Sequence, residues 1–248
     1  MSVLVIIPTF NERDSLPELV PLVLATPEAR VLVVDDESPD GTGQVADELA
    51  RRHHGRVDVL HRSGPRGLGH AYVAGIRTAL ESDAELICQM DADLSHDPQY
   101  LTPMIAAAAN HDLVIGSRYL NGVSVVNWPL RRLFLSAAAN RYIRLVTGLP
   151  VKDCTSGYRC WRREALEHVH MERIRSQGYA FLVESLHTAW VVGCRLAEVP
   201  IIFVERRQGA SKLSSSTLFE SALMPWRLRL RPSARETRAG KRVQGVRA

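Results

Sequence analysis

The chain has 248 residues, of which 46% are hydrophobic, and its formal net charge is +4. A chain of this length can bury roughly three quarters of its extended surface in one core. No apolar run reaches the roughly 18 residues that cross a bilayer, so we expect no membrane-spanning helix. The first residues lack a basic leader and the four cysteines lack a Cys-x-x-Cys spacing, which favours a cytoplasmic protein with reduced thiols.

Positive charge is concentrated at the end of the chain. From Pro225 onward there are eight Arg or Lys residues and one acid, a net charge of +7, so the preceding residues carry −3. A near-neutral body with a basic tail indicates an anionic partner, either a membrane leaflet or nucleic acid. The same composition is also typical of a disordered, solubilising tail, and the pattern alone leaves both interpretations open.

Five short apolar segments alternate with helical patterns through the first half of the chain. The first, residues 3–7, is mostly β-branched and stops at Pro8, which is typical of a strand buried on both faces. The expected strands are 3–7, 31–34, 57–60, 86–90 and 113–115, and the expected helices are 14–24, 43–52, 68–80 and 99–109. This alternation predicts an α/β fold, a mainly parallel Rossmann-like sheet flanked by helices in a single domain.

Polar motifs follow three of these strands, at residues 8–12, 35–36 and 91–93. Ligands of parallel sheets bind at the carboxyl ends of the strands, so we expect the three motifs to form one crevice. The chain has neither a G-x-G-x-x-G spacing after its first strand nor a Walker loop. Metal ions and cationic side chains, rather than a glycine-rich loop, are therefore expected to hold any phosphate groups.

Asp91 and Asp93 are the centre of this predicted site. The apolar run before them ends in two carboxylates one residue apart, which an extended backbone points to the same side. Two such carboxylates repel each other unless a cation lies between them, and a hard divalent ion bound to a phosphate is the usual occupant of an oxygen site. The alternative is that the pair caps a turn before Pro98.

The motifs of this chain form a series. They include Asp91-Ala92-Asp93-Leu94-Ser95-His96, and the others lie at 8–12, 34–42, 67–72, 116–119, 155–159, 178–181 and 198–212. The series resembles that of the family 2 inverting glycosyltransferases with the GT-A fold, and within that family the dolichol- or polyprenol-phosphate mannosyltransferases. The resemblance spans about residues 3–213, so residues 1–213 are expected to form the GT-A domain and 214–248 an amphipathic segment with a basic tail.

This resemblance implies a binding site for a nucleotide-sugar donor. The implied donor-binding residues are Pro8, Phe10, Glu12, Val34, Asp36, Asp91 and Ala92. The family usually has Tyr where this chain has Phe10, which preserves stacking on a base but removes a hydroxyl contact. Asp91 and Asp93 would hold Mg²⁺ or Mn²⁺ on the donor diphosphate, where the ion acts as a Lewis acid.

The resemblance also implies how the phosphates and the acceptor are handled. Asp93, Arg118, Arg206 and Lys212 would be the catalytic residues, the three cations binding phosphate oxygens. Arg132, Ser156 and Glu184 would bind the acceptor. A lipid monophosphate has its second pKa near ~6, so its oxygen is already charged at neutral pH and needs no strong general base. We therefore expect in-line attack with inversion.

Residues 128–146 are the segment that we expect to lie at a membrane surface. Stepped at 100° per residue, six side chains fall in an arc of about 120°; they are Phe134, Leu135, Ala138, Tyr142, Leu145 and Val146. An apolar face flanked by arginines can lie at a bilayer interface, although a helix packed in the core gives the same pattern. Residues 219–230 are a second candidate for surface anchoring, kept short by Pro225 and Pro232.

The resemblance thus implies transfer of mannose from GDP-mannose to a polyprenyl phosphate, with release of GDP, by a peripheral protein expected at the inner, cytoplasmic face of a membrane. A membrane-anchoring partner subunit is an additional expectation, and nucleic acid is not an expected partner. The main alternative is a UDP-hexose donor such as UDP-glucose. A sugar-1-phosphate nucleotidyltransferase would need a glycine-rich loop with Arg after the first strand, which residues 8–12 lack. A non-catalytic nucleotide-sugar-binding module is less compatible with the full set of phosphate-binding cations.

Overall fold

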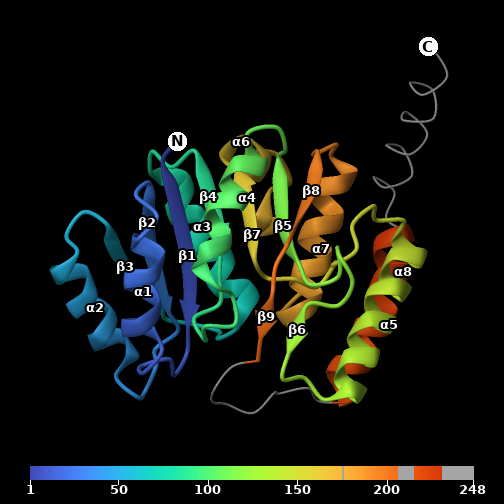
Figure 1. Ribbon diagram of the computed structural model, residues 1–248, viewed down its shortest axis with the longest axis horizontal. Coiled ribbons are helices and arrows are strands. Elements are labelled where there is room, and N and C mark those ends of the chain that lie inside the picture. Colours follow the sequence, from blue (N-terminus) through green and yellow to red (C-terminus); the bar gives the residue numbers. More distant parts are fainter. Residues whose placement is uncertain (175, 206–214, 231–248) are drawn as a thin grey trace.

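The computed structural model describes residues 1–174, 176–205 and 215–230, with only the backbone described at 215–222. A central seven-stranded sheet has the order β3-β2-β1-β4-β7-β5-β8 (Figure 1). Its strands are β1 (Val3–Thr9), β2 (Ala29–Asp35), β3 (Val57–His61), β4 (Leu86–Gln89), β5 (Leu113–Ser117), β7 (Arg159–Arg162) and β8 (Leu196–Pro200). Strands β6 (Val125–Val126) and β9 (Phe203–Val204) form a separate two-stranded sheet.

Helices cover both faces of the large sheet. They are α1 (Leu16–Leu24), α2 (Thr42–Arg52), α3 (Leu68–Glu81), α4 (Leu101–Ala108), α5 (Leu130–Thr147), α6 (Arg163–Val169), α7 (Gly178–Val191) and α8 (Ser215–Leu230), with short 3₁₀ helices at Pro98–Tyr100 and Met171–Arg173. Side chains of β1 alternate between two cores: Val3, Val5 and Ile7 face the α1, α2 and α4 side, and Leu4 and Ile6 face the α3, α6 and α7 side. The predicted α/β fold with a mainly parallel sheet is confirmed.

Strand β7 is the exception to the parallel arrangement, because it runs antiparallel to both β4 and β5. The sequence analysis missed it, since Arg159 and Arg162 interrupt any apolar run. Arg159 is nevertheless fully buried and donates hydrogen bonds to Ser156 O, Ser185 Oγ and Leu182 O at 2.7–3.0 Å. These three oxygens satisfy the guanidinium donors, which lets a cation occupy a core strand.

Helices α5 and α8 pack side by side at one edge of the molecule (Figure 1). Helix α8 is longer than the segment expected at 219–230, and Pro225 lies inside it rather than ending it. Met224 and Leu228 are buried in the same core as α3 and α7. This segment therefore adds to the core besides presenting a surface. The proposed domain boundary at residue 213 stays a prediction.

Gly75 sets how closely α3 approaches the sheet. A Cβ atom at this position would lie 2.6 Å from Cγ2 of Ile6 and 3.1 Å from Cγ2 of Val34. Ile6 is β-branched and fully buried, so its methyl group has little freedom to move away.

We expect Gly75→Ala to lower the free energy of unfolding by about 1–2 kcal/mol, because overpacking outweighs the better helix propensity of alanine. Urea denaturation of both proteins measures the difference. Equal or higher stability of the variant would show that α3 has room to move outward.

Candidate functional site

A cavity of about 270 Å³ opens at the carboxyl ends of β1, β4 and β5. It brings together seven of the residues expected from the sequence, which are Pro8, Glu12, Asp91, Ala92, Asp93, Arg118 and Arg132. The register explains the convergence, because Pro8 pairs with Val34, and Ile6 with Gln89, immediately before the polar motifs begin. Carboxylates from the end of β4 and guanidinium groups from the end of β5 and from α5 thus line one cavity.

The turn after β4 holds Asp91 and Asp93 in place. The Asp91 N–H donates to Nδ1 of His96 at 3.0 Å, and the Ser95 N–H donates to Oδ1 of Asp93 at 3.1 Å. Leu94, between Asp93 and Ser95, has a positive φ of 62°, a left-handed conformation that makes this turn tight. His96 is fixed in turn by stacking on Tyr158, with ring centroids 4.9 Å apart.

Tyr72 supports Asp91 from inside the fold. This residue of α3 is fully buried, and its hydroxyl donates to Oδ1 of Asp91 at 3.2 Å. Burial, followed by the charge of Asp91, raises the pKa of Tyr72 well above its ordinary value, so the hydroxyl stays a donor. The sequence analysis quoted Tyr72 within a motif but assigned it no role; only the packing of α3 under β4 reveals one.

The part of the chain that the structure describes contains no cluster of three or more His, Cys, Asp or Glu side chains arranged for a metal ion. Four carboxylates line this cavity, those of Glu12, Asp91, Asp93 and Glu205. A hard divalent ion accepts such oxygen ligands, and Mg²⁺ is commonly bound by one or two carboxylates plus substrate phosphates. The donor set therefore fits a metal ion that arrives with, or is completed by, a diphosphate.

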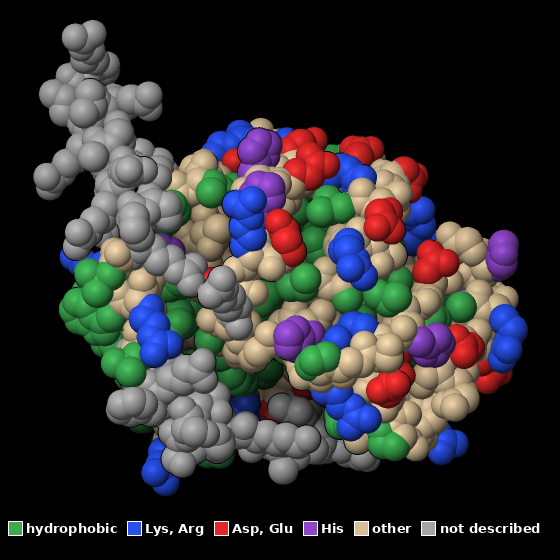
Figure 2. Space-filling model, turned by 180° about the vertical axis from the view of Figure 1, so that it is seen from behind, with side chains coloured by type: hydrophobic (Ala, Val, Ile, Leu, Met, Phe, Trp, Pro, Cys, Tyr) green, Lys and Arg blue, Asp and Glu red, His purple; other side chains and the backbone are tan. Residues whose placement is uncertain are grey.

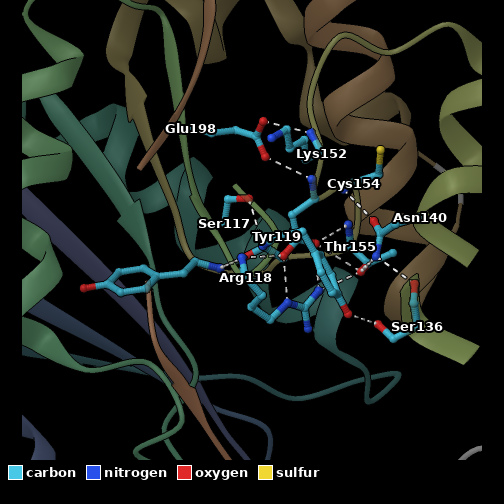
Figure 3. Close-up of polar contacts among 12 residues, drawn as sticks. Ser117, Arg118, Tyr119, Ser136, Asn140, Lys152, Cys154, Thr155 and Glu198 are labelled. Atoms are coloured by element: carbon cyan, nitrogen blue, oxygen red, sulfur yellow. Dashed lines mark hydrogen bonds and ion pairs between the residues drawn. The ribbon is translucent and has the colours of Figure 1, made fainter. Parts of the chain in front are cut away.

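Arg118 lies at the end of β5 (Figure 3). It forms a buried ion pair with Asp153. Its Nε and Nη2 each donate to one carboxylate oxygen at 2.7 Å, its backbone N–H donates to the same carboxylate at 3.0 Å, and Nη2 also reaches Thr155 Oγ1 at 2.8 Å. Burial alone would lower the pKa of Arg118, but the charge of Asp153 raises it above its ordinary value. The remaining nitrogen, Nη1, has no hydrogen-bond partner among the described residues and so can take an anion.

The Arg118–Asp153 pair is tied to its surroundings by further polar contacts. Glu198 of β8 accepts the backbone N–H groups of Lys152 and Asp153 at 2.8 and 2.9 Å, and Asn140 of α5 accepts the N–H of Cys154 and donates to Thr155 (Figure 3). The Tyr119 hydroxyl donates to Ser136 of α5 at 2.7 Å. Helix α5 is thereby fixed relative to the Arg118 guanidinium.

Arg132, near the start of α5, forms an ion pair with Glu205, and both side chains line the cavity. Its guanidinium lies over the ring of Trp128, with Cζ 4.1 Å from the ring centroid, and that of Arg118 lies over the same ring at 5.8 Å. Trp128 therefore brings the two cations into one part of the cavity. The expected position of Arg132 on the acceptor side is compatible with this placement.

Five other expected residues do not line this cavity. Asp36 accepts hydrogen bonds from Arg62 Nε and Gly67 N, and Val34 is fully buried against α3. Phe10 lies under the Arg66 guanidinium, 4.7 Å from Cζ to ring centroid. Ser156 Oγ accepts the Tyr158 N–H, and Glu184 is buried in α7, where it accepts the Ser176 N–H. Their expected roles stay predictions, and the burial of Val34 and Glu184 argues for structural ones.

The predicted catalytic residues Arg206 and Lys212 lie outside the described residues. Sequence reasoning assigned no site role to several side chains on the cavity wall, among them Trp128, Thr155, Tyr179, Leu182, Phe203 and Glu205. Thr155, Tyr179, Phe203 and Glu205 lie within motifs that it quoted, so a residue-level signal existed for them. Trp128 and Glu205 closely follow the strands of the small β6–β9 sheet, which has no sequence signature at two residues per strand.

Comparisons with known proteins show the family of this chain. The model of the family described as glycosyl transferase family 2 matches residues 4–169. Among curated proteins, polyprenol monophosphomannose synthase of Mycolicibacterium smegmatis is 48% identical, covering 88% of this chain and 83% of the relative. Undecaprenyl-phosphate mannosyltransferase of Micrococcus luteus is 46% identical (90% and 92%), and dolichol-phosphate mannosyltransferase of Pyrococcus furiosus is 37% identical (89% and 61%).

Solved structures support the fold. Glucosyl-3-phosphoglycerate synthase from Mycobacterium tuberculosis, solved with Mn²⁺, uridine diphosphate and phosphoglyceric acid, aligns with a TM-score of 0.68 at 15% identity. The alignment covers 93% of this chain and 79% of that one. A likeness at this identity concerns the arrangement of helices and strands. Taken with the match over residues 4–169, it leads to one conclusion: the chain belongs to glycosyl transferase family 2.

Proposed function

We propose that this enzyme transfers mannose from GDP-mannose to a polyprenyl monophosphate and releases GDP. The observation that carries the proposal is the lining of the cavity, which combines the carboxylates of Asp91 and Asp93 at the end of β4 with the guanidinium groups of Arg118 and Arg132. The first can serve a metal-bound donor diphosphate and the second an acceptor phosphate. The sugar and the lipid follow from the relatives at 46–48% identity, which are named for polyprenol and undecaprenyl phosphate mannose transfer.

The acceptor end of the cavity is equipped to hold a dianion. Arg118 offers Nη1 from a guanidinium that Asp153 fixes in orientation, and Arg132 lies near it over the same Trp128 ring. A phosphate monoester bound there presents an oxygen that is already ionised at neutral pH, since its second pKa is about 6. No proton has to be removed before attack, so the site needs orientation and charge rather than a general base.

Asp91 and Asp93 would hold a divalent ion, Mg²⁺ or Mn²⁺, with the diphosphate completing its coordination. When bound, such an ion neutralises the charge that develops on the leaving diphosphate. The chain's own contribution is to orient the two carboxylates: Tyr72 donates to Asp91, and the Ser95 N–H donates to Asp93. The hydrogen bond from the Asp91 N–H to His96 holds the turn against the repulsion between the Asp91 and Asp93 carboxylates.

The edge formed by α5 and α8 is suited to a lipid surface. Phe134 and Leu145 are 71% and 70% exposed and lie on one side of α5, and Trp226 and Leu230 of α8 are exposed beside it. Hydrophobic side chains gather at this edge of the molecule (Figure 2). Val146, which the sequence placed on the same apolar arc, is instead buried, so α5 uses one side for packing and another for the surface. No helix in the described ranges is long and apolar enough to cross a membrane.

We therefore propose a peripheral enzyme at the cytoplasmic face of a membrane, with the α5–α8 edge on the lipid and the cavity facing the acceptor headgroup. A membrane-anchoring partner subunit would strengthen this attachment. Full binding of a phenylalanine or leucine side chain to an apolar phase contributes about 1.5–3 kcal/mol, so a few such residues suffice for reversible attachment.

The donor and the metal are tested together. With polyprenyl phosphate and Mn²⁺, purified protein should transfer mannose from GDP-mannose, and Asp93→Ala should lower the rate at least about 100-fold, a loss typical of one removed electrostatic group. Radiolabelled sugar in the lipid phase measures transfer. The control is Asp97→Asn, an exposed acid in the same loop, which should keep full activity. Transfer from UDP-glucose but not from GDP-mannose would replace the proposed donor.

Arg118 depends on Asp153 as its counterion, and this dependence predicts a stability defect. Asp153→Asn should lower the free energy of unfolding by about 3 kcal/mol and weaken acceptor binding, because it leaves a buried guanidinium without its charge partner. Urea denaturation and acceptor titration measure the two effects. Asp112→Asn, which breaks a partly exposed pair with Arg195, is the control and should cost less than about 1 kcal/mol.

The defect of Asp153→Asn should also depend on pH. Although burial raises the pKa of Asp153, the charge of Arg118 and its hydrogen bonds lower it below its ordinary value. The stabilisation is thus complete above the ordinary Asp pKa of about 3.9 and is lost as the pH falls through the lower folded-state value. The two proteins should converge in stability below about pH 4. A difference that grows on acidification would contradict this assignment.

Membrane attachment is tested by replacing the exposed apolar residues. Phe134→Ser combined with Leu145→Ser should weaken binding to anionic phospholipid vesicles at least about ten-fold while leaving transfer to a soluble short-chain acceptor intact. Vesicle cosedimentation measures binding. Leu22→Ser, on exposed α1, is the control and should bind as the parent protein does. Unchanged vesicle binding in the double variant would move the lipid contact away from α5.

A further inference from the structure

The two arginines of the acceptor end have carboxylate partners of different kinds. Asp153 is fully buried and accepts three hydrogen bonds from Arg118, so it is a permanent counterion. Glu205 pairs with Arg132 where the side chains are 30% and 26% exposed. A buried, multiply bonded pair resists exchange, whereas a partly exposed pair contributes at most about 1 kcal/mol, which corresponds to about five-fold in an equilibrium.

Another anion can replace the Glu205 carboxylate at Arg132 if only the Glu205 side chain moves. Phe203 and Val204 of β9 pair with Val125 and Val126 of β6, and the Glu205 N–H donates to Val126 O at 3.2 Å. These contacts hold the backbone of Glu205 beside the cavity. The Arg132 guanidinium is held on its face by Trp128, which leaves its N–H edge for an anion. Rotation of the Glu205 side chain would vacate that edge while the strands stay in place.

We propose that Glu205 occupies the anion-binding edge of Arg132 in the free enzyme and is exchanged for the phosphate of the acceptor, so that Glu205 sets the acceptor affinity. The inference rests on the proposed function, in that the incoming anion is a phosphate monoester. In the empty cavity the carboxylate offsets the repulsion between Arg132 and Arg118, which share the Trp128 ring. A dianion displaces it because it brings twice the charge and reaches both guanidinium groups at once.

The test is Glu205→Gln in the full chain. Removing the competing charge should lower KM for a short-chain polyprenyl phosphate by about two- to five-fold without lowering kcat. It should also tighten binding of inorganic phosphate by a similar factor, measured by calorimetry without donor. A purely structural role of the ion pair predicts the opposite sign, since loosening Arg132 would raise KM. An unchanged or raised KM, with unchanged or weaker phosphate binding, overturns the proposal.

Two further variants make the result specific. Glu167→Gln removes the same charge from a partly exposed pair with Arg163 on α6 and should leave KM unchanged, which separates a local effect from a change in net charge. Arg132→Ala should raise KM, and adding Glu205→Gln to it should bring no improvement, because the competition acts through Arg132. An improvement that persists in the double variant would place the effect elsewhere and contradict the exchange.

Failure of the inference and failure of the proposed function give different results. If the parent protein transfers mannose to the lipid but Glu205→Gln brings no gain in affinity, the exchange is wrong and the reaction stands. If the parent protein transfers no sugar to polyprenyl phosphate, the proposed function is wrong. The inorganic phosphate titration then still decides whether Glu205 and an anion compete for Arg132.

Discussion

A guanidinium buried at the end of a strand is costly unless a carboxylate is buried with it, and the part of the cavity lined by Arg118 depends on that pairing. Asp153 supplies the carboxylate and binds the Nε–Nη2 edge of Arg118, leaving Nη1 without a partner among the described residues. Glu198 and Asn140 hold the 152–155 segment from β8 and from α5. The guanidinium that lines the cavity is thus positioned by the same contacts that join α5 to the sheet. One buried pair therefore links the charge of the cavity to the placement of the surface helix.

The carboxylate end of the cavity follows a similar rule with opposite charge. Asp91 and Asp93 leave the sheet together, and their repulsion is tolerated because the Tyr72 hydroxyl donates to Asp91 and the Ser95 N–H donates to Asp93. Tyr72 is the donor that comes from deepest in the fold, and its burial keeps it protonated beside an anion. Besides these donors, the two carboxylates need a cation to balance their charge. The described residues contain no cluster of three or more His, Cys, Asp or Glu side chains that would hold such an ion without further ligands. The arrangement favours a diphosphate that brings its ion with it.

The sequence predicted those parts of the molecule that depend on local pattern. Strands β1, β2 and β4 are β-branched or continuous apolar runs, and the motifs at the ends of β1 and β4 meet in one cavity as expected, whereas residues 35–36 at the end of β2 do not line it. The sequence could not reveal Asp153, because its partner Arg118 lies 35 positions away and no periodicity links them. Strand β7 was hidden for a related reason, since a cation in a core strand becomes acceptable only when oxygens from α7 surround it. Pairing across long separations is decided by the fold.

The contrast between Arg118 and Arg132 shows how one cavity can be both rigid and responsive. If both guanidinium groups had buried counterions, an incoming phosphate would have to compete with two strong pairs and would bind weakly. If neither had one, the empty cavity would hold two desolvated cations over a single Trp128 ring, which would force it open. One permanent carboxylate at Asp153 and one half-exposed carboxylate at Glu205 avoid both outcomes. In the proposed reaction the site binds a dianion and later releases a singly charged diester, and this unequal arrangement suits both steps.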